Sequence, residues 1–131
     1  MIFDKVEYWL ELCDDDMMVA KNLFKSKDFL WMAFLCHLVV EKSLKAIIAS
    51  TTEHEPKRIH DLAKLAEQAA LYNELTDEQI DFLEELTPFN IEARYPSHKE
   101  KMAIKLSHEY CKSILERTEG YLCWTKKLLG K

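Results

Sequence analysis

Apolar side chains recur every three or four positions through the first part of the chain, the spacing of one face of an α-helix. In residues 4–24 the repeat is regular, and Asp4 stands where a helix N-cap is expected. The pattern therefore predicts a first helix over residues 4–24. Its apolar positions are Trp9, Leu12, Cys13, Val19, Ala20 and Leu23.

A second helix is predicted over residues 28–50, and its first half is apolar on nearly every side. From Phe29 to Val40 only His37 interrupts the apolar run. Such a helix has to be covered on more than one face, so it is either the central helix of a bundle or part of a subunit interface. The run carries more apolar surface than one face of a small bundle covers, and we therefore expect a homodimer.

Three further helices are predicted after a polar loop, over residues 59–71, 77–86 and 98–128. Thr76 and Gln79 have the spacing of a capping box in front of the second of these helices. Pro88 ends that helix, and residues 89–97 are expected to be irregular. Gly120 is expected to mark a kink or a break in the last helix.

The whole chain, residues 1–131, is predicted to form one all-α domain of about five helices. Only 2 Gly and 3 Pro occur, which are too few chain breakers for a many-stranded β fold. The hydrophobic fraction of 48% and the charged fraction of 31% are typical of a globular protein.

The chain is expected to be cytoplasmic and not to enter a membrane. As a helix, the run from Phe29 to Val40 is about 18 Å long, whereas the apolar core of a bilayer is roughly 30 Å thick. The first residues are charged and contain no apolar signal segment. The four cysteines form no C-x-x-C pair, so we expect all of them to be buried, unpaired and without a catalytic role. They are Cys13, Cys36, Cys111 and Cys123.

Charge is distributed unevenly around a net value of −5. Residues 1–93 hold 9 Lys and Arg against 19 Asp and Glu, whereas residues 94–131 hold 9 against 4. The net charge argues against a general nucleic-acid binder. An anionic ligand is expected to meet the C-terminal third, unless the two halves complement each other inside the fold.

Three polar residues share one face of the second helix where its apolar half ends. His37, Glu41 and Lys45 follow each other at four-residue steps, and the acid precedes the lysine, which favours a helix ion pair. One interpretation is a surface ion pair beside a packed histidine. The other is a polar patch at the rim of a groove, in which Lys45 binds a ligand. His37, Glu41 and Lys42 would then support it.

His60 and Asp61 open the third predicted helix, directly after Lys57 and Arg58. An aspartate at this place favours a helix N-terminus, and His60 is a candidate for the cap itself. The alternative is that His60 contacts a ligand and that Asp61 supports it.

Arg94 and His98 flank Tyr95 and Pro96 in a loop that leads into the last predicted helix. An arginine next to a helix N-terminus can bind an anion, because its forked guanidinium and the backbone N–H groups converge. Tyr95 can stack on a base. The alternative is an ion pair between Arg94 and an acidic residue of the fourth helix.

Several kinds of chemistry have no signature in this sequence. Neither glycine belongs to a phosphate-binding loop, and no serine or cysteine stands in a nucleophile motif. The five histidines show no metal-binding spacing. Residues 14–16 are three consecutive aspartates that fan around a helix and do not converge, so we expect a solvated face. We therefore expect no metal and no cofactor.

Three short motifs occur in an order that resembles the HEPN family, the higher eukaryotes and prokaryotes nucleotide-binding domains. Residues 41–46 have the pattern E-K-x-L-K-A, residues 60–62 read H-D-L, and residues 93–96 read A-R-Y-P. The resemblance covers about residues 4 to 128.

The resemblance implies an up-and-down helical bundle that is usually dimeric and often encoded beside a minimal nucleotidyltransferase. Members are proposed to bind nucleotides or RNA. Some members are metal-independent endoribonucleases that use an arginine and a histidine with four to six residues between them. Arg94 and His98 have only three residues between them, which resembles the A-R-Y-P branch, where binding is proposed.

Three functions remain open at this point. The first is a non-catalytic module that binds a nucleotide or RNA and acts with a nucleotidyltransferase partner. The second is an endoribonuclease toxin of a toxin–antitoxin pair, with Arg94 and a histidine, His98 or His60, as its catalytic residues. The third is a purely structural dimerisation domain.

The sharpest expectation is one shared anion site at an end of the bundle. Arg94 would bind phosphate through both arms of its guanidinium, and Lys45 would add charge. Tyr95 would stack on a base, and His98 would donate from the helix N-terminus. His60 would lie close by. Glu41 of the second helix would orient Lys45 or His60 and would not touch the ligand.

Overall fold

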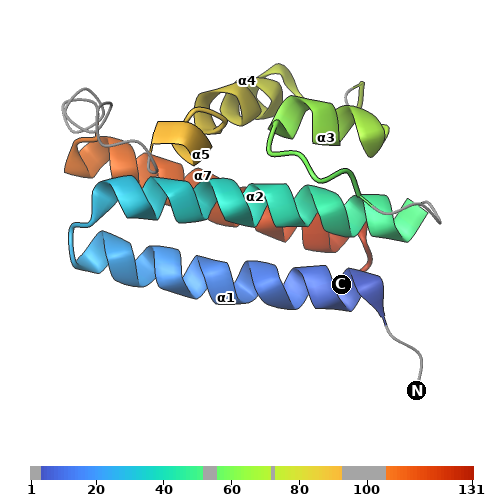
Figure 1. Cartoon of the computed structure of the whole chain (residues 1–131), viewed down its shortest axis with the longest axis horizontal. Coiled ribbons are helices and arrows are strands. Elements are labelled where there is room, and N and C mark those ends of the chain that lie inside the picture. The colour runs from blue at the N-terminus through green and yellow to red at the C-terminus, as the bar shows by residue number, and fades with distance from the viewer. Residues whose placement is uncertain (1–3, 52–55, 72, 93–105) are drawn as a thin grey trace.

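The computed structural model describes residues 4–51, 56–71, 73–92 and 106–131, and these form a helical bundle without any strand. The three long helices are α1 (Lys5–Lys25), α2 (Phe29–Thr51) and α7 (His108–Leu128). Three short helices, α3 (Leu62–Gln68), α4 (Asp77–Leu86) and α5 (Phe89–Glu92), lie on the side of α2 and α7 opposite α1 (Figure 1). The predicted all-α bundle is confirmed.

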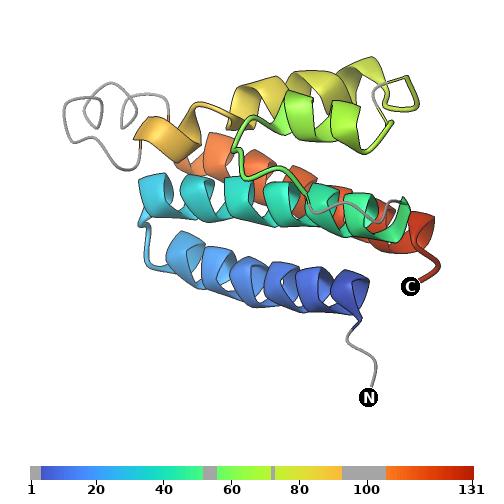
Figure 2. The same ribbon diagram turned by 45° about the vertical axis from the view of Figure 1, so that its right-hand side comes forward.

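Helix directions follow from the ion pairs between helices. α1 and α7 are antiparallel, since Lys21 meets Glu119 at 3.1 Å and Asp14 meets Lys126 at 2.7 Å. α1 and α2 form an antiparallel hairpin, and α4 runs antiparallel to α7. α2 and α7 run in the same direction, because both are antiparallel to α1 (Figure 2).

α2 is the central helix and contacts each of the other described helices. Its side chains Met32, Ala33, Cys36, Val39 and Val40 are fully buried. The prediction that this apolar helix needs cover on more than one side is therefore confirmed within one chain. No helix in the described ranges is both long and apolar enough to cross a membrane.

Two of the predicted helix starts are confirmed by their caps. The Asp4 side chain accepts from the backbone N–H of Glu7, and Thr76 and Gln79 form the reciprocal capping box of α4. The third helix begins later than predicted, and His60 is not its cap. Asp61 takes that position, because its carboxylate accepts the N–H of Lys64, a bond that an imidazole before it does not make.

The later boundaries differ more from the sequence prediction. Residues 89–92 are helical as α5, so the irregular segment does not begin at Phe89. The predicted start of the last helix at His98 lies outside the described residues; within them, Ser107 caps α7. α7 continues unbroken through Gly120, and the expected break is wrong. Buried side chains on both sides of that glycine, Thr118 and Leu122, hold the helix in the core and outweigh its low helix propensity.

Three of the four cysteines are buried free thiols, as predicted, whereas Cys123 is exposed. The prediction for Cys123 is wrong because the buried face of α7 passes through Tyr121, Leu122 and Thr125, and position 123 points away from it. Burial raises the pKa of Cys13 to about 12, so its thiolate is scarce at neutral pH.

The environment of Gly120 predicts a gain in stability on substitution. A Cβ added at this position meets nothing within 4 Å, and the backbone is helical. Gly120→Ala should therefore raise the free energy of unfolding by about 0.5–1 kcal/mol, because alanine loses less backbone entropy in a helix. Denaturant unfolding checks this, and an unchanged or lower midpoint would contradict it.

Candidate functional site

Glu41 is a buried carboxylate on α2 with two basic side chains bonded to it. Its side chain is 5% exposed. His60 Nδ1 donates to Oε1 across 2.8 Å, and Lys45 Nζ donates to Oε2 across 3.3 Å. Partners from its own helix and from the segment before α3 therefore compensate the buried charge. The alternative of a solvated surface pair does not hold for this carboxylate.

His37 ties the segment before α3 to the same face of α2. Its ring is fully buried, and Nε2 lies 3.1 Å from the backbone carbonyl oxygen of His60. A carbonyl oxygen only accepts, so Nε2 carries the hydrogen of this contact. Nδ1 lies 3.8 Å from Glu41 Oε1, too far for a hydrogen bond. Residue 60 is thus held against α2 by both its backbone and its side chain.

His60 is oriented by Glu41 although its side chain is 49% exposed. Because the carboxylate accepts from Nδ1, the second nitrogen, Nε2, is left to meet solvent or a ligand. A carboxylate bonded to one nitrogen of an imidazole fixes the tautomer and the orientation of the ring. The Glu41–His60 pair is therefore suited to hold or transfer a proton, or to donate to an anion.

Lys45 connects this cluster to a neighbouring pocket that the sequence analysis missed. The ammonium lies 5.5 Å from the centre of the Trp9 ring, within cation–π range. The pocket has a volume of about 290 Å³, and its described lining consists of Tyr8, Trp9, Lys45, Pro56 and Arg58. One signal in the sequence indicates it. Two adjacent aromatic residues cannot both face the core of one helix, because consecutive side chains point about 100° apart.

Two residues predicted to support the site have structural contacts elsewhere. Lys42 Nζ lies 2.6 Å from a carboxylate oxygen of Asp16 and so joins α2 to α1. Asp61 caps α3. The aspartates of residues 14–16 include two partners of lysines, Lys42 and Lys126, and no group of potential metal ligands occurs among the described residues.

Arg94, Tyr95 and His98 lie outside the described residues, so their part in the predicted site stays a prediction. The last residue described before them, Glu92, ends α5, which lies over the Phe29 half of α2 (Figure 1). Lys45 lies in the last third of that helix. Of the predicted ligand contacts, the structure brings together Lys45 and His60.

Three of the five basic residues that the structure describes in the C-terminal third pair with acids from the rest of the chain. Lys126 meets Asp14 at 2.7 Å, and Lys131 meets Glu7 at 3.3 Å. The Arg117 guanidinium binds Glu85 at 2.6 Å. These pairs support the interpretation that the two halves complement each other inside the fold, and they leave α7 less attractive to an anion.

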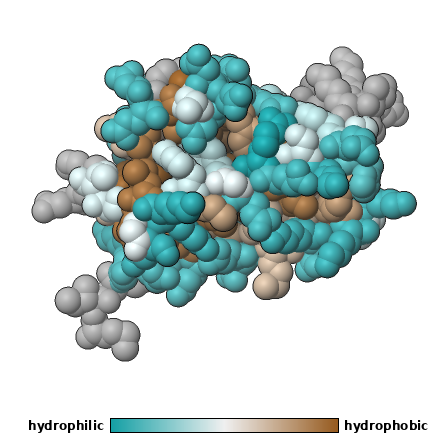
Figure 3. Space-filling view, turned by 180° about the vertical axis from the view of Figure 1, so that it is seen from behind, coloured by the Kyte–Doolittle hydropathy of each residue, from teal (hydrophilic) through white to brown (hydrophobic). Residues whose placement is uncertain are grey.

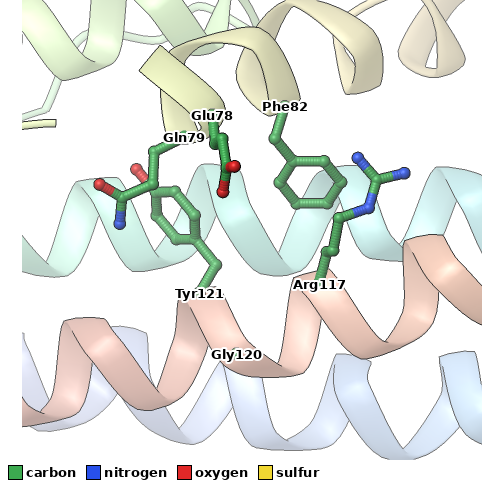
Figure 4. A pocket seen from close by; sticks show the side chains of 6 residues that line it. All are labelled: Glu78, Gln79, Phe82, Arg117, Gly120 and Tyr121. Atoms are coloured by element: carbon green, nitrogen blue, oxygen red, sulfur yellow. The ribbon is translucent and has the colours of Figure 1, made fainter. Parts of the chain in front are cut away.

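A second cavity, of about 200 Å³, lies between α4 and α7 above Gly120 (Figure 4). Its wall contains the Phe82 ring with the Arg117 guanidinium carbon 4.7 Å from the ring centre. The donors of Arg117 are bound to Glu85 and Ser113. Although burial opposes it, hydrogen bonds from Arg117 hold the pKa of Glu85 low, which keeps this pair charged. The arginine is therefore occupied.

A third hollow, of about 460 Å³, lies where α2 and α7 end, next to the end of α3. Ile47, Leu71 and Leu129 line it, and apolar surface shows on the rear face of the molecule (Figure 3). Glu74 is the charged residue of its described lining, which disfavours an anion. The cluster around Glu41 thus remains the candidate site.

Comparison with protein families decides the assignment. The model of the HEPN domain matches residues 6–128, nearly the whole chain. The chain belongs to the HEPN family. Comparison with curated proteins and with solved structures gave no significant match. In this HEPN domain, Glu41 of the E-K-x-L-K-A motif binds both Lys45 of the same motif and His60 of the H-D-L motif.

The burial of Glu41 predicts a large effect of removing its charge. Glu41→Gln keeps the shape but leaves Lys45 without its buried counter-charge, so we expect a loss of about 1–3 kcal/mol in unfolding free energy. Glu84→Gln, an exposed glutamate on α4, is the matched control and should change stability by less than about 0.5 kcal/mol. Equal melting temperatures of the two variants would show that the cluster adds nothing to stability.

Proposed function

We propose that this HEPN domain binds nucleotides or RNA and holds phosphate with Lys45 and His60. The observation that carries the proposal is the shared buried carboxylate: Glu41 holds both basic side chains at one place, while half of the His60 ring stays exposed. Glu41 thereby orients the two groups from behind. Membership of the HEPN family supports this class of ligand.

Phosphate recognition follows from the donors that remain. Lys45 uses part of its ammonium on Glu41 and keeps further N–H groups for a ligand, and His60 offers Nε2. Arg94, Tyr95 and His98 belong to the proposal as further ligand contacts. Arg94 would add a forked donor, Tyr95 a stacking surface and His98 a helix-terminal donor.

The proposal includes a protein partner and a cellular location. A minimal nucleotidyltransferase is the proposed partner, on the strength of the motif resemblance, and the cytoplasm is the proposed compartment. Three buried free thiols support a reducing environment.

An endoribonuclease is the second candidate, and the Glu41–His60 pair favours it. His60 Nε2 would take the proton from a ribose 2′-OH, and the 2′ oxygen would attack the adjacent phosphorus. His98 would give a proton to the departing 5′ oxygen, which leaves a 2′,3′-cyclic phosphate and a 5′-hydroxyl. Lys45 and Arg94 would stabilise the charge on the phosphoryl oxygens. A binding module differs in releasing its RNA intact.

Binding to short single-stranded RNA and to mononucleotides tests both candidates. Lys45→Gln and Arg94→Ala should each cost about 1.5–3 kcal/mol of binding free energy, as loss of a charge-assisted hydrogen bond does. Arg94→Lys should recover only part, since the fork is lost.

Lys112→Gln changes an exposed residue of α7 and is the control. It should bind RNA and mononucleotides as the wild type does. New 5′-hydroxyl ends that vanish in His60→Ala would favour the nuclease. Unchanged affinity in every variant would remove the site, and a lower melting temperature with normal affinity would make these residues structural.

Dimerisation is common among HEPN domains, and we propose a homodimer through α2. Trp31 is 46% exposed and meets Phe34 edge to face, with ring centres 5.9 Å apart. Trp31→Glu would place a charge in such an interface and should convert the protein to monomer in sedimentation experiments. Met18→Glu, on the side where α1 meets α7, is the control and should stay dimeric. A monomeric wild type at tens of micromolar contradicts the proposal.

A further inference from the structure

The pocket beside Lys45 has two aromatic walls that meet at a corner. Tyr8 and Trp9 contact each other edge to face, with centres 5.4 Å apart and planes at 69°. The buried seam of α1 passes through Leu10, Cys13 and Met17, so the Trp9 ring lies beside the seam, whereas Tyr8 lies on the far side of the helix. Tyr8 remains 45% exposed. Part of the aromatic surface is therefore not buried in the core and is available for stacking on a base.

Positive charge completes the pocket. Lys45 leads into it from α2, and Arg58 lines it from the segment before α3. Arg58 is exposed. The pocket therefore offers the two kinds of group that bind a nucleotide. Its aromatic corner can stack on the base, and its two cations can donate hydrogen bonds to the phosphate.

We propose that this pocket, the Trp9 pocket (Tyr8, Trp9, Lys45, Pro56 and Arg58), takes a single nucleoside phosphate. The base packs in the aromatic corner, and the phosphate binds between Lys45 and Arg58. This inference rests on the proposed function and names the ligand subsite next to the Glu41 cluster. The volume of about 290 Å³ is at the lower end of small-ligand pockets and so favours one nucleotide over a longer strand.

Two consequences distinguish the pocket from a simple phosphate site. Stacking improves with the size of the base, so adenosine monophosphate should bind more tightly than uridine monophosphate, and ribose 5-phosphate least of all. Lys45 belongs both to the Glu41 cluster and to the Trp9 pocket, because it bonds to Glu41 and lies over the Trp9 ring. Its loss should weaken all three ligands.

The test is calorimetric titration of adenosine monophosphate and ribose 5-phosphate into the full chain. Trp9→Leu should weaken the binding of adenosine monophosphate about 5- to 150-fold, the range for loss of one base–aromatic stack, and should hardly change the binding of ribose 5-phosphate. Arg58→Gln should weaken both. Trp124→Leu removes a tryptophan that is also partly buried but does not line the pocket, and it should bind like the wild type.

Trp9 is partly buried against the core, so its loss can also lower stability. Tyr8→Ala, at an exposed ring, and a melting curve for each variant separate binding from folding. Weaker adenosine monophosphate binding by folded Trp9→Leu or Tyr8→Ala supports the pocket. If only Lys45→Gln weakens binding, the Trp9 pocket is wrong while the proposed function stands. If Lys45→Gln, Trp9→Leu and Tyr8→Ala all leave nucleotide affinity unchanged, or if the wild type binds no nucleotide, the Trp9 pocket and the proposed function are both wrong.

Discussion

Glu41 carries a negative charge into the bundle interior, where an uncompensated carboxylate costs several kcal/mol. Lys45 and His60 compensate it, and His37 fixes the backbone at residue 60 from the other side. Because of these bonds, the segment before α3 lies against α2, and Arg58 comes to line the same pocket as Lys45. One buried charge thus determines where the basic groups of the site stand.

The parts of the fold that depend on neighbouring residues in the chain were predictable. The caps at Asp4 and Thr76 act over three residues. The apolar run of α2 indicated either a central helix or a subunit interface, and within the chain α2 is central. It was harder to predict which of two adjacent residues caps a helix. Asp61 caps α3 in place of His60, because a short carboxylate reaches the free N–H groups better.

The site was predictable only in the half that lies on one helix. His37, Glu41 and Lys45 share a face by their four-residue spacing. Lys42 is their neighbour in sequence but turns to Asp16 on α1, a contact that depends on how two helices pack. The Trp9 wall depends on the same packing, since its place beside Lys45 joins residues 36 positions apart.

The pairing of α1 with α7 has a consequence for the order of folding. The α1–α2 hairpin is complete in the first 51 residues, but Asp14 meets a lysine 112 positions later. During synthesis on a ribosome, the face of α2 that holds Cys36 therefore stays uncovered until α7 has been made. A nascent chain of this kind exposes its most apolar helix for longest, which makes that helix the natural contact for chaperones and the first place for misassembly.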